Sequence, residues 1–133
     1  MILVDTSVLI DFLKGTDNDA VRTLDNILEM GISYGINEFI YQEVLQGART
    51  VEEFDRLKEY LETMSFYSLK SGKESYERAA LLYFNCRRAG ITIRSTIDLL
   101  IAQTAIENDL YLLHNDNDFT NMGKAVSDLK FYY

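Results

Sequence analysis

The sequence predicts an α/β protein with a central parallel sheet of four to five strands and helices on both faces. Short apolar runs typical of strands alternate along the chain with segments whose apolar residues follow helical spacing. This alternation is the pattern of βαβ units. The chain has 133 residues, the size of one domain, and no linker, repeat or low-complexity segment interrupts it. We therefore expect residues 1–133 to form a single domain.

Five apolar runs are candidates for the strands. The first is the run 2–4, which is expected to be a short buried strand because Asp5 ends it. The other candidates are residues 32–36, 66–69, 110–114 and 129–133. We expect the last of these, at the end of the chain, to be an edge strand.

Helices are expected between these runs, and capping residues mark several of their ends. The apolar spacing predicts helices over residues 9–13, 20–28, 37–47, 51–64, 71–88 and 96–108. Thr50 with Glu53 and Ser71 with Glu74 match the capping box, in which each side chain bonds the backbone amide of the other residue. Further cap and stop residues are expected to be Gly15, Gly31, Asn37, Gly47 and Gly90.

The composition restricts the class of protein. Apolar residues make up 47% of the chain and charged residues 26%, which excludes a disordered chain, a collagen-like fibre and a disulfide scaffold. The single cysteine, Cys86, rules out an internal disulfide and fits a reducing cytoplasm. The apolar start of the chain has no basic region before Asp5, so we expect no signal peptide. No apolar run approaches the roughly 18 residues of a membrane span.

The chain is acidic. It has 21 acidic against 13 basic residues, which gives a net charge of −8. Such a chain repels nucleic acid over most of its surface, so basic partners or bound cations are its expected companions.

Two acidic residues occupy unusual positions in the first third of the chain. Asp5 directly follows a buried strand, where it could equally be a turn residue or the N-cap of the next helix. Glu43 falls on the apolar stripe of its helix together with Ile40 and Val44. A carboxylate on a core-facing stripe pairs with a cation, becomes protonated or binds a metal, so a buried salt bridge is the alternative for Glu43.

Three further acidic residues lie in the last third. Asp98 continues an apolar stripe with Ile101 and Ala102, although Ser95 to Asp98 also matches a capping box. Asp116 and Asp118 follow the strand predicted over 110–114, where a simple polar turn would explain them as well.

The set of acids is more informative than any member, because the carboxyl ends of parallel strands meet at one edge of a sheet. Carboxylates brought together would repel by roughly 4 kcal/mol per close pair at an intermediate dielectric. Divalent cations could hold them, and hard oxygen ligands favour Mg²⁺ or Mn²⁺. The lone histidine cannot build a zinc site, and no glycine-rich phosphate loop is present. An acidic magnesium site points to phosphate chemistry.

Four segments carry a family likeness, and their order and spacing span the chain. They are Ile2 to Ile10 (ILVDTSVLI), Glu43 to Gly47 (EVLQG), Asp98 to Ala102 (DLLIA) and Asn115 to Phe119 (NDNDF). The sequence resembles the PIN-domain endoribonucleases, most closely the VapC toxins of bacterial and archaeal toxin–antitoxin pairs. The resemblance implies a small PIN-like α/β fold and a ribonuclease that uses one or two Mg²⁺ or Mn²⁺ ions to activate water.

The resemblance also implies roles for individual residues. It assigns Asp5, Glu43, Asp98 and Asp116 as catalytic, metal-binding acids, with Asp118 as a fifth metal ligand. Thr6 and Ser7 are expected to support the acids by hydrogen bonds. At His114 the chain departs from relatives, which commonly have Thr or Ser there. Candidate contacts to the RNA backbone are Arg87, Arg88, Arg94 and Lys124, although for each of them solvated surface charge is the favoured alternative.

The resemblance further implies a cytoplasmic homodimer with an RNA substrate and an antitoxin that inhibits it. The main alternative is a catalytically inactive PIN-like module that binds RNA or serves assembly, although all four acids are present. A phosphatase or phosphoacceptor domain with Asp5 as nucleophile is a third hypothesis. The sequence lacks the partner lysine at a strand end that this hypothesis requires.

Overall fold

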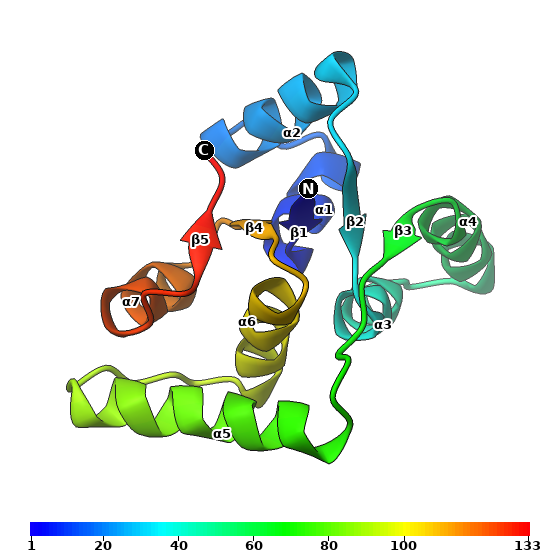
Figure 1. Ribbon diagram of the computed structural model, residues 1–133. Helices are drawn as coiled ribbons and strands as arrows, with labels where there is room; N and C mark the ends of the chain where they lie inside the picture. The colour runs from blue at the N-terminus through cyan, green and yellow to red at the C-terminus, as the bar shows by residue number, and fades with distance from the viewer.

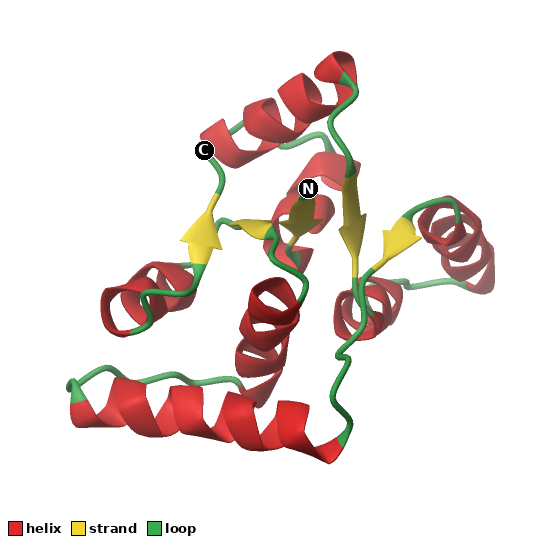
Figure 2. Ribbon diagram, in the orientation of Figure 1, coloured by secondary structure: helices red, strands yellow, loops and turns green.

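We describe a computed structural model that covers residues 1–133, in which strands and helices alternate along the chain (Figures 1 and 2). The strands are β1 (Ile2–Val4), β2 (Tyr34–Ile36), β3 (Ser65–Phe66), β4 (Tyr111–Leu113) and β5 (Lys130–Phe131). The helices are α1 (Thr6–Lys14), α2 (Asp19–Met30), α3 (Glu38–Gln46), α4 (Val51–Glu62), α5 (Lys73–Arg88), α6 (Thr96–Glu107) and α7 (Asn117–Ala125). None of the seven helices has the length and apolar character needed to span a membrane.

All five strands belong to one parallel sheet with the order β3-β2-β1-β4-β5, which confirms the predicted fold class. From β1 the chain builds the sheet outward through β2 to β3. It then returns to the other side of β1 and continues with β4 and β5. Ligands of α/β sheets bind at the carboxyl ends of the strands where the order reverses in this way. The carboxyl ends of β1 and β4 are therefore the expected position of a site.

Helices cover the sheet on both sides. Figure 1 shows α2 on one side of the row of strands and α5, α6 and α7 on the other. β1 lies at the centre of the core, and Leu3 and Val4 have no exposed surface. Helix α6 has more buried residues than any other helix, since all residues from Leu99 to Ala105 are buried. The acids at the end of β1 and on α6 thus lie on rigid elements.

Several predicted helix ends are confirmed. Gly15 and Gly31 end α1 and α2 with φ of 76° and 67°, a left-handed conformation that glycine adopts without a steric penalty. The Asn37 side chain accepts a hydrogen bond from the Ile40 amide and caps α3. Thr50 caps α4 by accepting a bond from the Glu53 amide.

The predicted capping box at Ser71 and Glu74 is wrong. Helix α5 begins at Lys73, and Gly72 occupies its N-cap with φ of 55° and no side-chain capping bond. The Ser71 amide instead donates to the hydroxyl of Ser75. The left-handed turn at Gly72 moves the start of the helix beyond the residue that the motif favours.

Strand β3 is shorter and earlier than the predicted run 66–69. Its only neighbour is β2, which ends at Ile36 because Asn37 begins the next helix. The last ladder bond in this region runs from the Tyr67 amide to the Ile36 carbonyl. The predicted edge strand at the end of the chain is confirmed, although only Lys130 and Phe131 pair with β4.

Gly35 allows β2 and β3 to approach each other closely. A β-carbon at this position would lie 2.3 Å from the Ser65 carbonyl oxygen and 2.7 Å from the Tyr67 ring. Gly35→Ala is expected to lower the free energy of unfolding by about 1–3 kcal/mol, because the strand must shift to accommodate the methyl group. Urea denaturation measures the loss. Gly47→Ala is the control, since its φ is helical, and equal stability of the two variants would show that the close approach is unimportant.

Candidate metal centre

The candidate site begins at the carboxyl end of β1, where Asp5 caps α1. The Asp5 side chain accepts hydrogen bonds from the Ser7 amide at 3.0 Å and the Ser7 hydroxyl at 2.6 Å. Asp5 is only 4% exposed. Burial raises the pKa of its carboxyl group to about 6, the Ser7 bonds oppose this increase, and the charge of Glu43 adds to it. Asp5 is therefore an N-cap, as one of the two interpretations predicted. The same side chain is also a carboxylate that is costly to ionise.

Glu43 comes to the same place from α3. Its carboxylate accepts a 2.8 Å hydrogen bond from the Thr6 hydroxyl. No lysine, arginine or histidine forms an ion pair with Glu43. The buried salt bridge considered from the sequence is therefore absent. Thr6 and Ser7, which are consecutive residues of α1, each support a different acid.

Asp98 lies in the first turn of α6, and the capping box that could have explained it does not form. Ser95 is the N-cap residue, but its side chain makes no capping hydrogen bond. Burial and the charges of Asp5, Asp116, Glu43 and Asp118 together raise the pKa of the Asp98 carboxyl group to about 7. Asp98 is therefore a second carboxylate that is costly to ionise.

Asp98 meets two acids that follow β4. Asp98, Asp116 and Asp118 each offer a carboxylate oxygen, and these three oxygens lie within 4.8 Å of one another. Asp116 also caps α7, because its side chain accepts a 2.9 Å bond from the Asp118 amide. We call Asp5, Glu43, Asp98, Asp116 and Asp118 the acid cluster.

The acid cluster fits a divalent cation. All its donors are carboxylate oxygens, which is the ligand type of Mg²⁺ and Mn²⁺. Burial and the charges of neighbouring acids raise the pKa values of Asp5 and Asp98, and Asp118 alone among the five acids is paired with a basic residue, so the protein compensates the charge of the cluster only in part. A bound cation would supply the missing compensation and keep the carboxyl groups ionised at neutral pH.

His114 and Asn115 hold the segment that carries Asp116. The Asp116 amide donates a 3.2 Å hydrogen bond to Nδ1 of His114, and the imidazole packs edge-on against Phe131. Burial lowers the pKa of His114, which favours the neutral ring whose Nδ1 accepts this bond. The Asn115 amide donates to the Ser7 hydroxyl at 3.1 Å. Sequence reasoning missed these supports, because they depend on the pairing of β1 with β4.

Among the four basic candidates, only Arg94 reaches the acid cluster. Its guanidinium bonds both oxygens of Asp118, at 3.3 and 3.4 Å. Arg87 and Arg88 lie over the rings of Tyr83 and Phe84 on their own helix. Lys124 bonds Asn121 of the same helix. The last three make no contact with the cluster.

Comparison with known proteins agrees with this geometry. The family model of the PIN domain matches residues 2–125. The chain is 31% identical over 128 residues to VapC ribonuclease Mb1587 of Mycobacterium bovis, and the match covers 96% of this chain and 95% of that protein. Ribonuclease VapC11 of Mycobacterium tuberculosis shows the same identity and coverage.

Solved structures show the same fold. VapBC2 from Rickettsia felis, in a crystal structure bound to a promoter DNA fragment, superimposes with a TM-score of 0.74 at 18% identity, over 99% of this chain and 98% of that chain. VapBC-1 from nontypeable Haemophilus influenzae gives a TM-score of 0.72 at 20% identity, over 99% and 97% of the two chains. With the family match over nearly the whole chain and curated relatives above 30% identity, this protein belongs to the PIN-domain family, among the relatives of the VapC ribonucleases.

Proposed function

We propose that the protein is an endoribonuclease that depends on Mg²⁺ or Mn²⁺ and is the toxin of a toxin–antitoxin pair. The observation that carries the proposal is the acid cluster, assembled from β1, α3, α6 and the β4–α7 segment at the reversal of the strand order. The names of the curated relatives support a ribonuclease. In this proposal Asp5, Glu43, Asp98 and Asp116 hold one or two ions, and residues 1–133 form one nuclease domain.

The roles of the residues follow from their contacts. A divalent ion, when bound, supplies Lewis-acid chemistry for hydrolysis of a phosphodiester by water. Ser7 and Thr6 keep the Asp5 and Glu43 carboxylates oriented through hydroxyl bonds. His114 holds the backbone of Asp116 by accepting a bond from its amide. Because β1 and α6 are buried, they hold their acids in place, and little rearrangement of the chain is needed when an ion binds.

Asp5→Asn tests the proposal. The purified protein should cleave RNA in Mn²⁺ and stop when EDTA is added, and the variant should not cleave. Asparagine is a good N-cap, so α1 should still form. Asp25→Asn is the control, because Asp25 is an exposed residue of α2 outside the cluster. Equal cleavage by Asp5→Asn and wild type would end the proposal, and a folded protein that binds no Mn²⁺ in calorimetry would support the inactive module instead.

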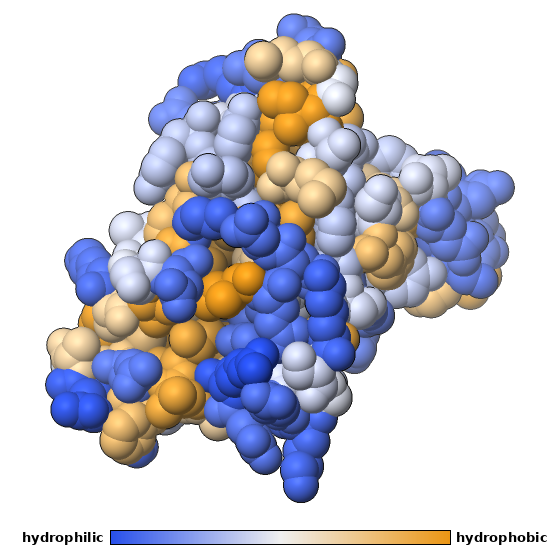
Figure 3. Space-filling view, viewed as in Figure 1, coloured by the Kyte–Doolittle hydropathy of each residue, from blue (hydrophilic) through white to orange (hydrophobic).

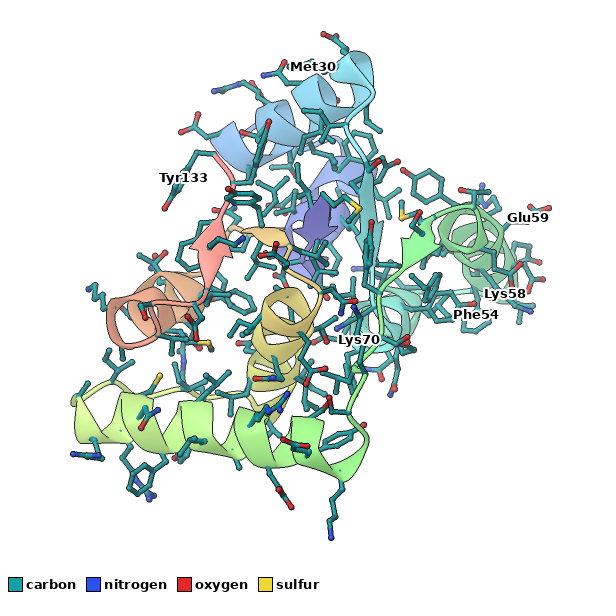
Figure 4. The ribbon with its side chains drawn as sticks, viewed as in Figure 1. Met30, Phe54, Lys58, Glu59, Lys70 and Tyr133 are labelled. Atoms are coloured by element: carbon teal, nitrogen blue, oxygen red, sulfur yellow. The ribbon has the colours of Figure 1, made fainter.

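The antitoxin has a candidate docking surface beside α3. A groove of about 680 Å³ lies between α1, α3 and α4, and its apolar lining includes Ile10, Leu13 and Leu57. Its basic residues are Lys14, Arg49 and Arg56, against the single acid Glu53. Figure 4 shows Phe54, Lys58 and Glu59 of α4 at the outer edge of the molecule. Copurification of the protein with the co-expressed product of a neighbouring reading frame tests this partner.

A homodimer in the cytoplasm remains a prediction. Helix α5 exposes Tyr76, Leu81 and Phe84, which are 52%, 54% and 45% accessible. Figure 3 shows apolar surface in this region of the molecule. Light scattering of the purified protein measures the oligomeric state directly.

A further inference from the structure

Arg94 lies against the acid cluster in a geometry suited to a second negative partner. Its Nε and one terminal nitrogen face the two oxygens of Asp118 at 3.4 and 3.3 Å. The Asp118 side chain is only 10% exposed, while that of Arg94 is 77% exposed. A guanidinium has five N–H groups, so three of them remain directed away from Asp118.

Arg94 is the single cation of the protein that pairs with the acid cluster. The other ion pairs join surface residues, or Arg78 with Glu107, away from these five acids. Its partner Asp118 offers a carboxylate oxygen within 4.8 Å of those of Asp98 and Asp116, which places the charge of Arg94 beside these three acids. Arg94 also directly precedes the N-terminus of α6, where Ser95 gives the first amides no side-chain partner.

A purely structural role explains this arrangement poorly. An ion pair with so exposed an arginine contributes little to stability, since water screens it. The two bonds are long for a charged pair, so the guanidinium is held loosely and can take a second ligand. Among the groups that an RNA presents, a phosphate has the negative charge and the paired oxygens that match a guanidinium fork.

We propose that Arg94 binds a backbone phosphate of the RNA at the mouth of the acid cluster, and that Asp118 positions Arg94 for this contact. The inference rests on the proposed ribonuclease function. It gives Asp118 a role besides that of fifth metal ligand, because its two oxygens face the guanidinium. It also offers a way for an acidic protein to hold RNA beside its most acidic surface.

The salt dependence of RNA binding tests this inference. Asp5→Asn serves as the background in which cleavage is prevented, and a short fluorescein-labelled single-stranded RNA is titrated by anisotropy in Mn²⁺ over a series of KCl concentrations. Adding Arg94→Ala should lower the slope of log K against log salt by about 0.7, the value for one phosphate contact on a single strand. The same slope corresponds to about a fivefold loss of affinity at 0.1 M salt.

Two further variants separate a phosphate contact from general damage. Arg78→Ala is the matched control, because Arg78 is also exposed and paired with a carboxylate, that of Glu74. It should leave the slope unchanged. Arg94→Lys keeps the charge but loses the fork, so it should restore part of the affinity.

Calorimetry with Mn²⁺ in the absence of RNA measures metal affinity, which should not fall together with RNA affinity. Removal of a positive charge beside the cluster should leave Mn²⁺ affinity unchanged or increase it in Arg94→Ala, while RNA affinity falls. Parallel losses of Mn²⁺ and RNA affinity, or a slope equal to that of Arg78→Ala, would overturn the role of Arg94. If wild type cleaves RNA while the slopes are equal, only this inference fails. If the folded protein neither binds nor cleaves RNA, the proposed function fails with it.

Discussion

Asp98→Asn should reduce RNA cleavage by at least about 100-fold and, in the absence of metal, make the protein more stable than wild type. Loss of a residue that merely supports a metal ligand already costs 10- to 100-fold, so loss of a ligand should cost no less. The gain in stability follows from the pKa of Asp98, which burial and four neighbouring acids raise to about 7. At pH 8 the folded protein must keep this carboxylate charged beside the others, and asparagine removes that repulsion.

Two measurements check this prediction, and their opposite signs make it specific. Cleavage of RNA in Mn²⁺ reports the first effect, and urea denaturation in EDTA at pH 8 reports the second. Asp128→Asn removes the same charge from an exposed residue outside the cluster, and it should alter neither result strongly. An Asp98→Asn protein that is less stable than wild type in EDTA would contradict the repulsion at the site.

The sequence predicted the order of the elements except for α7, where a polar turn was the only local signal considered, and the other elements were predicted because their signals are local. Strand run 2–4, the caps at Asn37 and Thr50, and the helix ends at Gly15 and Gly31 each depend on a few neighbouring residues. The wrong capping box at Ser71 had the same kind of local signal. There the conformation of Gly72 decided where the helix starts, and the motif contains no information about that angle.

The acids of the candidate site and the supporting hydroxyls of Thr6 and Ser7 were predicted, whereas the contacts of His114, Asn115 and Arg94 were not. Asp5, Glu43, Asp98 and Asp116 stand out because carboxylates at strand ends or on apolar stripes need an explanation. The bond from the Asn115 amide to the Ser7 hydroxyl joins residues 108 positions apart. The pair of Arg94 and Asp118 depends on how the loop before α6 meets α7. Such contacts follow from the strand order β3-β2-β1-β4-β5, which local patterns do not specify.

The strand order also explains why each acid, taken alone, had a purely local structural explanation. Taken alone, Asp98 matched a capping box, and Asp116 with Asp118 matched a polar turn. In the fold Asp116 is indeed an N-cap and still lies within reach of Asp98. A local structural role and a role in the site are therefore compatible in this protein, because the N-termini of α1, α6 and α7 converge at the ends of β1 and β4.

The metal-free protein should lose stability as the pH rises from 5.5 to 7.5, and saturating Mn²⁺ should reverse this trend. The folded-state pKa values of Asp5 and Asp98, about 6 and about 7, exceed the value near 3.9 of an unfolded aspartate. Between these limits the folded state binds more protons than the unfolded state, so the free energy of unfolding falls as pH increases. His114 opposes the trend below about pH 6.5, because burial lowers its pKa. Two carboxyl groups against one imidazole leave a net decrease.

Mn²⁺ should reverse the trend because it binds the carboxylates only after their protons leave. An ion present at 100 times its dissociation constant stabilises the folded state by about 2.7 kcal/mol. At one fixed Mn²⁺ concentration the stabilisation should be larger at pH 7.5 than at pH 5.5, because protons compete for the carboxylates at the lower pH. The midpoints of urea denaturation, measured in EDTA and in Mn²⁺ at pH 5.5 and at pH 7.5, give the pH dependence of stability with and without the metal. Asp98→Asn is the control, since without the Asp98 carboxyl group the decrease in EDTA should become shallower. A wild-type protein whose stability in EDTA increases with pH, or a variant with an unchanged slope, would show that the acid cluster is not the source of the effect.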